Sequence, residues 1–279
     1  MVRLQNIDLV FNRGTIDENR LFEDFNLSVE SGEFVAIVGS NGSGKTTLLN
    51  LICGTMRPDR GTVFLGAADG TDAVGAATKS PTGCRRPKAA DVTTMPEYKR
   101  AKRIGRVLQD PKMGTCADLT ILENLSLADN KNKSYDLKGA VNRQREEYYK
   151  SLLETCNMGL ENRMGTLAGA LSGGQRQALA LMIATMSDID LLILDEHTAA
   201  LDPKSSETLM EITQKVVSEK KYTTLMVTHN LRFAVEYGTR LVMMHSGSAV
   251  MDIAGEKKQQ LKVDDILGKF NEISIECGN

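Results

Sequence analysis

The chain has 279 residues, of which 41% are hydrophobic and 25% charged, and its formal net charge at pH 7 is -2. This length and composition are typical of a globular protein that forms one large α/β domain, or a core with an inserted subdomain. The small negative charge argues against a nucleic-acid-binding protein, so we expect no nucleic-acid partner.

The cysteines and the apolar runs indicate where the protein works. The five cysteines are scattered and form no C-x-x-C pair, which argues against a disulfide framework or a zinc site and favours a reducing compartment. The N-terminus lacks the apolar core of a signal peptide. No apolar run approaches the roughly 20 residues that cross a bilayer. We therefore expect a cytoplasmic protein that serves any membrane from outside the lipid.

The first part of the chain predicts strands, a loop and a helix in that order. Residues 4–11 and 25–29 read as strands of an N-terminal sheet, and residues 34–38 form a wholly apolar run, as in a strand buried on both faces of a parallel sheet. A glycine-rich loop follows, and then a helix from about Thr46 to Cys53 that Gly54 ends. Residues 67–90, rich in Gly, Ala, Thr, Ser and Pro, predict a flexible inserted surface loop.

The second part of the chain predicts helices between strands. The pattern is helical from about residue 118 to residue 187, and residues 175–186 are apolar almost all round, which predicts a buried helix. Residues 191–194 and 224–227 return to buried strands. Strands that alternate with helices indicate a parallel sheet covered on both faces, and the helical block between them indicates an inserted subdomain.

The strongest motif lies between the apolar strand and the first helix. It reads G-x-x-x-x-G-K-[ST], the phosphate-binding P-loop, and comprises Gly39, Ser40, Asn41, Gly42, Ser43, Gly44, Lys45 and Thr46, followed by Thr47. Glycines let successive N–H groups face a phosphate, and the helix N-terminus adds partial positive charge. Lys45 can reach the β- and γ-phosphates, and Thr46 can ligate Mg²⁺. We therefore expect ATP and Mg²⁺ as cofactors.

A pair of acids supplies the second part of such a site. Asp195 and Glu196 end the apolar strand 191–194, where stability alone explains two carboxylates poorly because buried uncompensated charge is unfavourable. Asp195 would hold the metal, through water, and Glu196 would polarise an attacking water as general base.

The segment 171–177 reads Leu-Ser-Gly-Gly-Gln-Arg-Gln and precedes that strand. By itself it could be an ordinary helix cap. In this order it resembles the signature sequence of ABC ATPases, a second phosphate cradle made by Ser172, Gly173, Gly174 and Gln175.

The resemblance extends to further single residues. Gln109 resembles the Q-loop glutamine, which contacts Mg²⁺ and water and relays to the membrane partner. Asp202 resembles the D-loop aspartate, and His229 the switch histidine that contacts the γ-phosphate. Phe11 is either the aromatic that stacks on adenine or a core phenylalanine. The resemblance thus implies Glu196, His229, Lys45 and Gln109 as catalytic residues, with Thr46, Gln109 and Asp195 at the metal.

The family resemblance also implies the architecture. We expect an α/β P-loop NTPase (RecA-like) core with an N-terminal antiparallel β-subdomain and an inserted α-helical subdomain, in one ABC ATPase domain over 1–279. Core and β-subdomain would take 1–112 and 188–279, and the helical subdomain 113–187. The family works as a head-to-tail homodimer, with each ATP between 39–46 of one copy and 172–175 of the other.

Two features depart from most of the family: His197 stands in place of proline, and 67–90 is an addition. The string DEHTAALDP at 195–203 is similar to a bacterial subgroup whose members partner small permeases and lipoprotein receptors, some linked to aromatic amino acids.

The expected function is therefore that of the ATP-hydrolysing subunit of an importer, held at the cytoplasmic face of the cell membrane by integral permease subunits. An extracytoplasmic substrate-binding protein would be an indirect partner. Three alternatives stay open: an exporter ATPase, a soluble ABC ATPase of DNA maintenance or translation, and a regulator with a dead site. Soluble ABC ATPases of DNA maintenance or translation usually carry coiled coils, zinc modules or two ABC units. A regulator with a dead site would lack catalytic groups that this chain has.

Overall fold

The computed structural model describes residues 1–66, 89–131 and 141–276. A flexible loop is expected over residues 67–90, and residues 67–88 of that range lie outside the described residues. Its last residue, Ala90, belongs to a short strand that pairs with Leu65. No helix in these described ranges is long and apolar enough to cross a membrane.

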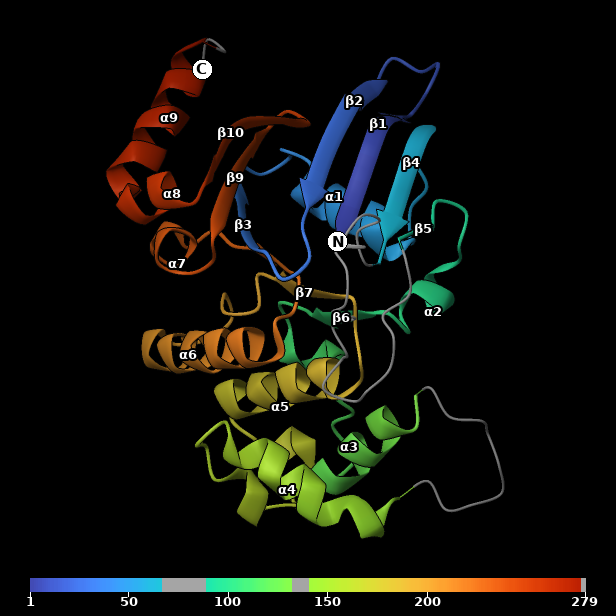
Figure 1. Ribbon diagram of the computed structural model, residues 1–279, viewed down its shortest axis with the longest axis vertical. Helices are drawn as coiled ribbons and strands as arrows, with labels where there is room; N and C mark the ends of the chain where they lie inside the picture. Colours follow the sequence, from blue (N-terminus) through green and yellow to red (C-terminus); the bar gives the residue numbers. More distant parts are fainter. Residues whose placement is uncertain (67–88, 132–140, 277–279) are drawn as a thin grey trace, which may run out of the picture.

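The strands form two sheets (Figure 1). The first is antiparallel, in the order β2-β1-β4-β5, and its strands are β1 (Val2–Phe11), β2 (Asn19–Val29), β4 (Arg60–Leu65) and β5 (Ala90–Asp91). The second has the order β10-β9-β3-β8-β7-β6, and its strands are β3 (Phe34–Gly39), β6 (Ile104–Val107), β7 (Leu191–Asp195), β8 (Thr224–Val227), β9 (Arg240–His245) and β10 (Ser248–Ala254). Only the edge pair β10–β9 of the second sheet is antiparallel. The α/β class with a parallel sheet is confirmed.

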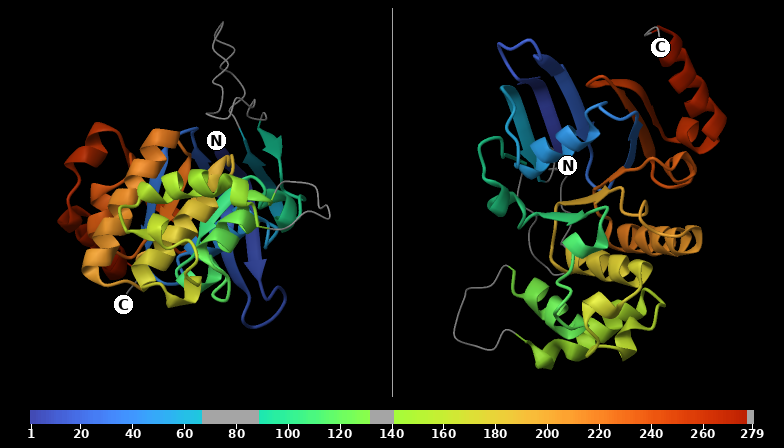
Figure 2. Two further views of the ribbon diagram at one scale, coloured as in Figure 1. Left: turned by 90° about the horizontal axis from the view of Figure 1, so that it is seen from below. Right: turned by 180° about the vertical axis from the view of Figure 1, so that it is seen from behind.

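Helices cover the sheets and form a separate group at one end of the molecule. They are α1 (Lys45–Cys53), α2 (Glu97–Arg100), α3 (Ile121–Asp129), α4 (Glu146–Glu154), α5 (Gly173–Met186), α6 (Pro203–Lys220), α7 (Leu231–Glu236), α8 (Glu256–Gln260) and α9 (Val263–Glu276). Short 3-10 turns lie at Pro111–Met113, Arg143–Arg145, Leu160–Asn162 and Ala168–Ala170. The views in Figures 1 and 2 place α3, α4 and α5 at the end opposite the antiparallel sheet.

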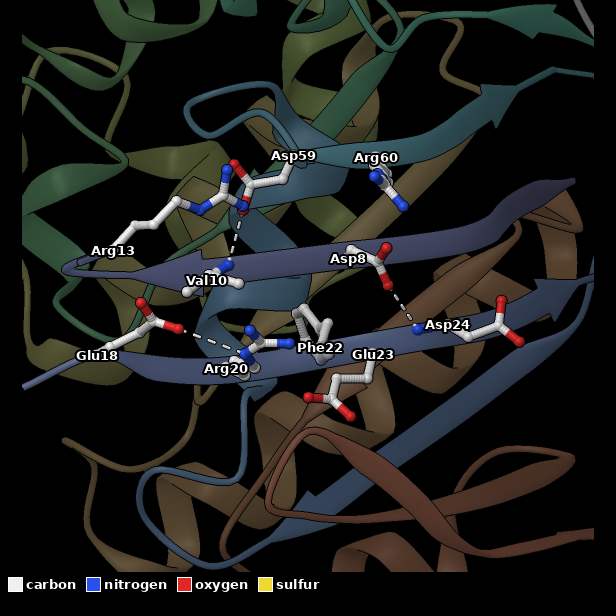
Figure 3. Close-up of a pocket in the computed structure, with 10 residues that line it drawn as sticks. All are labelled: Asp8, Val10, Arg13, Glu18, Arg20, Phe22, Glu23, Asp24, Asp59 and Arg60. Atoms are coloured by element: carbon white, nitrogen blue, oxygen red, sulfur yellow. Dashed lines mark hydrogen bonds and ion pairs between the residues drawn. The ribbon is translucent and has the colours of Figure 1, made fainter.

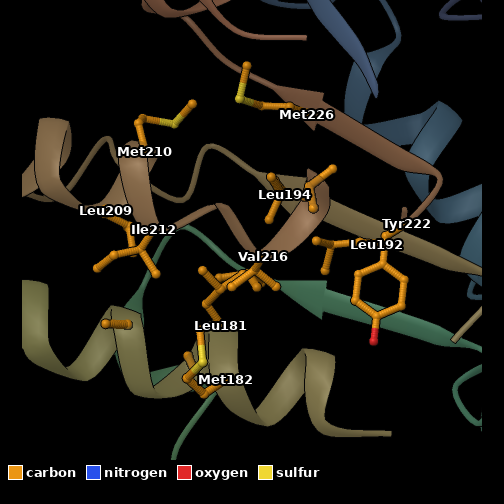
Figure 4. Packing of buried hydrophobic residues seen from close by; sticks show 14 of the residues in the cluster. Leu181, Met182, Leu192, Leu194, Leu209, Met210, Ile212, Val216, Tyr222 and Met226 are labelled. Carbon is orange, nitrogen blue, oxygen red and sulfur yellow. The ribbon is translucent and has the colours of Figure 1, made fainter. Parts of the chain in front are cut away.

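Two apolar layers sandwich the parallel sheet, because successive side chains of a strand point to opposite faces. In β3, Val35 and Ile37 join the layer that contains α1 and the antiparallel sheet. Ala36 and Val38 join the layer that contains α5 and α6. Figure 4 shows the second layer, where side chains of α5 and α6 meet those of β7 and β8. The wholly apolar strands of the sequence are thus explained by burial on both faces.

The helix predicted for about 46–53 is confirmed as α1, and both of its ends are fixed. Gly54 ends it at φ 85°, with its N–H donating to Asn50 O. The fully buried Arg100 donates to the carbonyls of Leu51 and Ile52, which supplies positive charge at the negative end of the helix dipole. Arg100 therefore anchors the end of α1 that lies opposite the P-loop, and so helps to fix the position of the whole helix.

The predicted start of the second strand, at residue 25, is wrong. β2 begins at Asn19, and its register against β1 shifts between Ile7 and Leu9. Asp24 takes a positive φ of 47° there and donates its N–H to Asp8 Oδ1. This irregularity breaks the alternation of polar and apolar residues, so the first half of the strand does not read as one.

His197, the departure from proline, is only 2% exposed. Its Nε2 lies 3.4 Å from Thr213 Oγ1 on α6. Because the Thr213 hydroxyl donates its hydrogen to Leu209 O, its oxygen can accept a hydrogen bond from the imidazole N–H. Burial lowers the pKa of His197 to about 4. The histidine is therefore a neutral hydrogen-bonding core residue.

We predict that His197 makes the fold sensitive to acid. An unfolded histidine has a pKa near 6.5, so between pH 6.5 and 4 the unfolded chain binds a proton that the folded chain does not, and stability falls as the pH is lowered. At pH 5.0 this should reduce the free energy of unfolding by about 2 kcal/mol relative to pH 7.5. His197→Gln keeps an N–H donor without this titration, and urea unfolding at both pH values should show a smaller decline. Equal declines in the two proteins would contradict the assignment.

Candidate functional site

A cavity of about 370 Å³ opens at the start of α1. It brings together three regions that are far apart in the sequence: the turn between β1 and β2, the P-loop, and the ends of β7 and β8. Its lining residues are Phe11, Asn19, Leu21, Asn41, Gly42, Ser43, Gly44, Lys45, Thr46, Thr47, Glu196 and His229. Gly39 and Ser40 begin the same loop.

Glycine is required in the loop by conformation and by space. Gly42 has φ 79° and Gly44, the N-cap of α1, has φ 101°, both in the left-handed region. A Cβ on Gly39 would collide with Met244 O. The unpaired N–H groups of the first turn of α1 therefore open on the cavity and, with the helix dipole, favour an anion such as a phosphate.

Lys45 lies across the loop with its ammonium group directed back at it. Nζ donates to Gly39 O and Ser40 O, both at 2.8 Å. Burial lowers the pKa of Lys45, and the carboxylate of Glu196 partly opposes that effect. The loop thus holds a cation with carbonyl partners beside the anion-binding backbone.

Glu196 and His229 face each other on the opposite side of the cavity. β7 and β8 are parallel neighbours with Asp195 opposite Val227, so the residues that follow the two strands meet. Glu196 adopts a positive φ of 50°, which costs roughly 1–2 kcal/mol for a residue with a side chain. Its Oε1 lies 2.8 Å from His229 Nε2. Backbone strain of this kind is often found at functional sites.

The Glu196–His229 pair can also be reached from a second side. Both residues line another cavity, of about 510 Å³, together with Leu201 and Asn230. The pair therefore separates the P-loop cavity from the segment that carries Asp202.

Asp195 has a counterion that the sequence analysis missed. Arg106 Nη2 lies 2.7 Å from Asp195 Oδ2, and the two side chains are 24% and 15% exposed. Arg106 comes from β6, opposite Ile193 of β7. Arg106 Nε has no partner within the described ranges. A lone cation inside an otherwise buried strand was the signal that could have identified it, because such a charge needs a partner.

The oxygen donors near the cavity suit Mg²⁺. Thr46 presents a hydroxyl at the start of α1, and Asp195 ends β7. The described residues contain no group of three or more His, Cys, Asp or Glu that could hold a metal. Mg²⁺ usually binds one or two carboxylates together with waters and substrate phosphates. The donor set therefore fits a metal that arrives with a phosphate ligand.

The remaining predicted residues lie outside the cavity. Ser172 caps α5, accepting the Gln175 N–H, while Gln175 Oε1 accepts the Ser172 N–H, so the helix-cap alternative describes its local geometry. Asp202 caps α6 and accepts from Ser205 N–H. Hydrogen bonding from the Ser205 side chain and from its backbone N–H lowers the pKa of Asp202. Gln109 is exposed after β6. None of these residues lines the P-loop cavity of this single chain.

A charged cavity of about 580 Å³ lies nearby on the antiparallel sheet (Figure 3). Four of its charged side chains form two ion pairs. Arg13 lies 3.3 Å from Asp59, which also accepts from Val10 N–H, and Arg20 lies 3.4 Å from Glu18. These contacts tie down the turn after Phe11 and so help to place Phe11, which is half-buried against the core and at the edge of the P-loop cavity. Both readings of Phe11 are compatible with this position.

Comparisons with known proteins show which proteins the chain resembles. A family model described as "ABC transporter" matches residues 22–199. The tyrosine transport ATP-binding protein of Clostridioides difficile is 42% identical over 97% of this chain and 98% of its own length. The thiamine import ATP-binding protein ThiQ of Shigella sonnei is 33% identical over 80% of this chain and 82% of its own. The dimeric ATP-binding cassette MJ0796, solved in a post-hydrolysis state with ADP and Pi, has a TM-score of 0.69 and 25% identity over 91% of this chain and 98% of its own.

We predict that the Arg106–Asp195 pair contributes measurably to stability. Arg106→Met leaves the Asp195 carboxylate without a counterion and should lower the free energy of unfolding by about 1–3 kcal/mol. Asp195→Asn should relieve part of that loss, giving a coupling energy of about 1 kcal/mol or more in a double-mutant cycle followed by urea unfolding without nucleotide. The exposed pair Arg232–Glu207 is the control and should couple by less than about 1 kcal/mol. Equal coupling in the two cycles would contradict the assignment.

Proposed function

The chain belongs to the ABC transporter family as an ATP-binding and ATP-hydrolysing subunit, and we propose that it drives solute import by closing and reopening a head-to-tail dimer. The observation that carries the proposal is the P-loop cavity, where a phosphate-binding backbone faces a carboxylate–imidazole pair. Anion-binding groups and a base on opposite sides of one cavity suit attack of water on a terminal phosphate.

We assign the following roles in that reaction. The N–H groups of residues 39–46 and Lys45 bind the phosphates of ATP. Glu196 accepts a proton from the attacking water as general base, and its 2.8 Å contact with His229 orients the carboxylate. His229 then steadies the γ-phosphate by a hydrogen bond. Phe11, at the edge of the cavity, stacks on the adenine.

Mg²⁺ would be held by Thr46 and Asp195, with Gln109 as a further oxygen donor, and it would neutralise charge that develops on the phosphates. Asp195 is paired with Arg106 in the nucleotide-free chain. The carboxylate is therefore already oriented at the end of β7 before nucleotide binds.

A second copy of the chain would complete the site. Ser172 and Gly173 are exposed and lie outside the P-loop cavity of their own chain. In a head-to-tail dimer the segment 172–175 of one copy contacts the γ-phosphate bound by the other, and Asp202 lies at the interface. ATP then favours the closed dimer because it contacts both copies only there. The dimeric state of the MJ0796 cassette supports this arrangement.

The partner in the membrane would be a permease that docks beside Gln109. A cavity of about 620 Å³ lies there between the parallel sheet and α3, and its rim carries Met113 and Leu127, which are 70% and 59% exposed. Exposed apolar side chains around a cavity are typical of protein-binding surfaces. Docking would hold the chain at the cytoplasmic face of the membrane. The name of the thiamine import relative favours import over export. An amino acid would be the class of solute, because another relative is named for tyrosine transport. An extracytoplasmic binding protein would deliver the solute to the permease.

We predict that Glu196→Gln separates ATP binding from hydrolysis. The amide keeps the shape of the side chain but cannot accept the proton of water, so kcat should fall by about 10²-fold or more with ATP affinity changed by less than about threefold. The purified variant should therefore elute as an ATP-dependent dimer in size-exclusion chromatography.

Two companion variants test the assignment. Lys45→Ala should weaken ATP binding itself, and Ser172→Arg, placed in the Glu196→Gln background, should abolish the dimer while ATP still binds. Near-normal turnover by Glu196→Gln would show that Glu196 is not the base. A dimer that persists with Ser172→Arg would show that the signature does not complete the site.

We predict that an uptake assay with labelled tyrosine identifies the class of solute. Cells that lack the chain should regain uptake of labelled tyrosine when the wild-type chain is restored together with its permease, and should not regain it with Glu196→Gln. Unlabelled phenylalanine and thiamine serve as competitors. Uptake that recovers equally with both chains, or that thiamine alone blocks, would contradict the proposal.

A further inference from the structure

Gln177 is a fully buried polar residue in the otherwise apolar part of α5. It lies five residues after Ser172, or about 7.5 Å along the helix axis. Its neighbours on α5, from Ala178 to Met182, are apolar and buried. Gln177 does not line the P-loop cavity, and it lies beyond the four residues, 172–175, that form the proposed phosphate cradle.

The amide nitrogen of Gln177 holds two catalytic segments at once. Nε2 donates to Leu108 O at 2.7 Å and to His197 O at 2.9 Å. Leu108 directly precedes Gln109, and His197 directly follows Glu196. One rigid carboxamide therefore ties the segments that carry the proposed Q-loop glutamine and the proposed general base to the helix that begins at the signature.

Arg176, the preceding residue of α5, fixes the far end of the same Gln109 segment. Its Nε donates to Thr115 Oγ1 at 2.6 Å, and the side chain is 8% exposed. The stretch between Leu108 and Thr115, with its 3-10 turn Pro111–Met113, is thus held at both ends by consecutive residues of one helix. Gln177 differs from Arg176 because it alone also reaches the segment after Glu196.

The carboxamide at position 177 has an unfavourable as well as a favourable effect on stability. Gln177 Oε1 is buried without a hydrogen-bond partner in the described ranges. A buried polar atom without a partner is unfavourable, and an apolar side chain of the same size would relieve that penalty. The same replacement would remove the donor that Leu108 O and His197 O now share, which is itself unfavourable. What the glutamine adds is a connection between backbone segments, since the carbonyls it binds lie 69 and 20 residues away in the sequence.

We propose that Gln177 is a positioning residue for ATP hydrolysis, one that transmits the docking of the signature on the partner's nucleotide to Glu196 and Gln109. This inference rests on the proposed function, because it takes from it the roles of Ser172, Gln109 and Glu196. When the start of α5 is drawn onto the γ-phosphate, the carboxamide moves with it and pulls the Leu108 and His197 carbonyls, so that base and glutamine reach their working positions only in the closed dimer.

The test compares Gln177→Met with Thr185→Val in the full chain. Methionine keeps the length of the side chain and removes both donated bonds. Thr185 is also fully buried on α5, but its hydroxyl bonds only within its own helix, to Leu181 O and Met182 O, so its variant controls for loss of a buried polar group. Gln177→Met should lower kcat roughly 10- to 100-fold, as expected for a misplaced catalytic group. The affinity for a fluorescent ATP analogue and KM should change less than threefold, and Thr185→Val should keep kcat within threefold.

Amide hydrogen exchange provides the second measurement. In the Glu196→Gln background, adding ATP should slow amide exchange in residues 104–116 and 195–202 when Gln177 is present. With Gln177→Met, ATP should not slow exchange in these two segments. Residues 146–156 of the helical region are the control and should exchange alike in both proteins. A kcat within twofold of wild type for Gln177→Met, or an equal loss for Thr185→Val, would overturn the inference. If Glu196→Gln and Lys45→Ala are themselves fully active, the proposed function fails first; if they are inactive and Gln177→Met is not, only this inference fails.

Discussion

The parallel pairing of β3, β8 and β7 is the constraint on which the rest of the site depends. Parallel neighbours end at the same edge of a sheet, so the residues that follow the three strands meet there although they lie near positions 40, 196 and 229. Hydrophobic burial fixes this pairing, because the strands are apolar on both faces and lie between two helix-containing layers. A phosphate-binding loop, a carboxylate and an imidazole therefore share one cavity because of the sheet, and the contact between Glu196 and His229 follows from that pairing.

The two acids at that edge have partners of different kinds. Asp195 is paired with an arginine from the same sheet, an arrangement set by strand register and therefore rigid. Glu196 meets His229, an exposed side chain on a loop. A buried partner within the sheet suits a residue that must hold its position, whereas an exposed partner suits a residue that must exchange protons with water. This difference is in keeping with the separate roles, metal ligand and general base, that we propose for Asp195 and Glu196.

The sequence allowed the local parts of this arrangement to be predicted, and it concealed the long-range ones. Short-range patterns of apolar residues and glycines in the sequence were enough to predict the P-loop, α1 with Gly54, and the strands that contain Asp195 and Val227. The start of β2 was missed because a bulge at Asp24 interrupts its alternation. The partners of Arg106 and Gln177 lie 89 and 69 residues away, and a single sequence carries no information on such pairings beyond the oddity of a polar residue in an apolar element.

The placement of the signature has a consequence for energy coupling. For hydrolysis to drive transport, the base must become active only when the dimer closes. Otherwise each chain would hydrolyse ATP without a partner, and the free energy of hydrolysis would not be linked to transport. The signature lies at the start of α5, and the described contacts that lead from that helix to the segments beside Glu196 and Gln109 include the Gln177 carboxamide. Because the carboxamide is short, buried and bonded to backbone rather than to side chains, it can transmit a displacement of the helix without absorbing it in rotamer changes. Helix α5 also borders the cavity beside Met113. A permease docked in that cavity would therefore contact the same helix that carries the signature and Gln177.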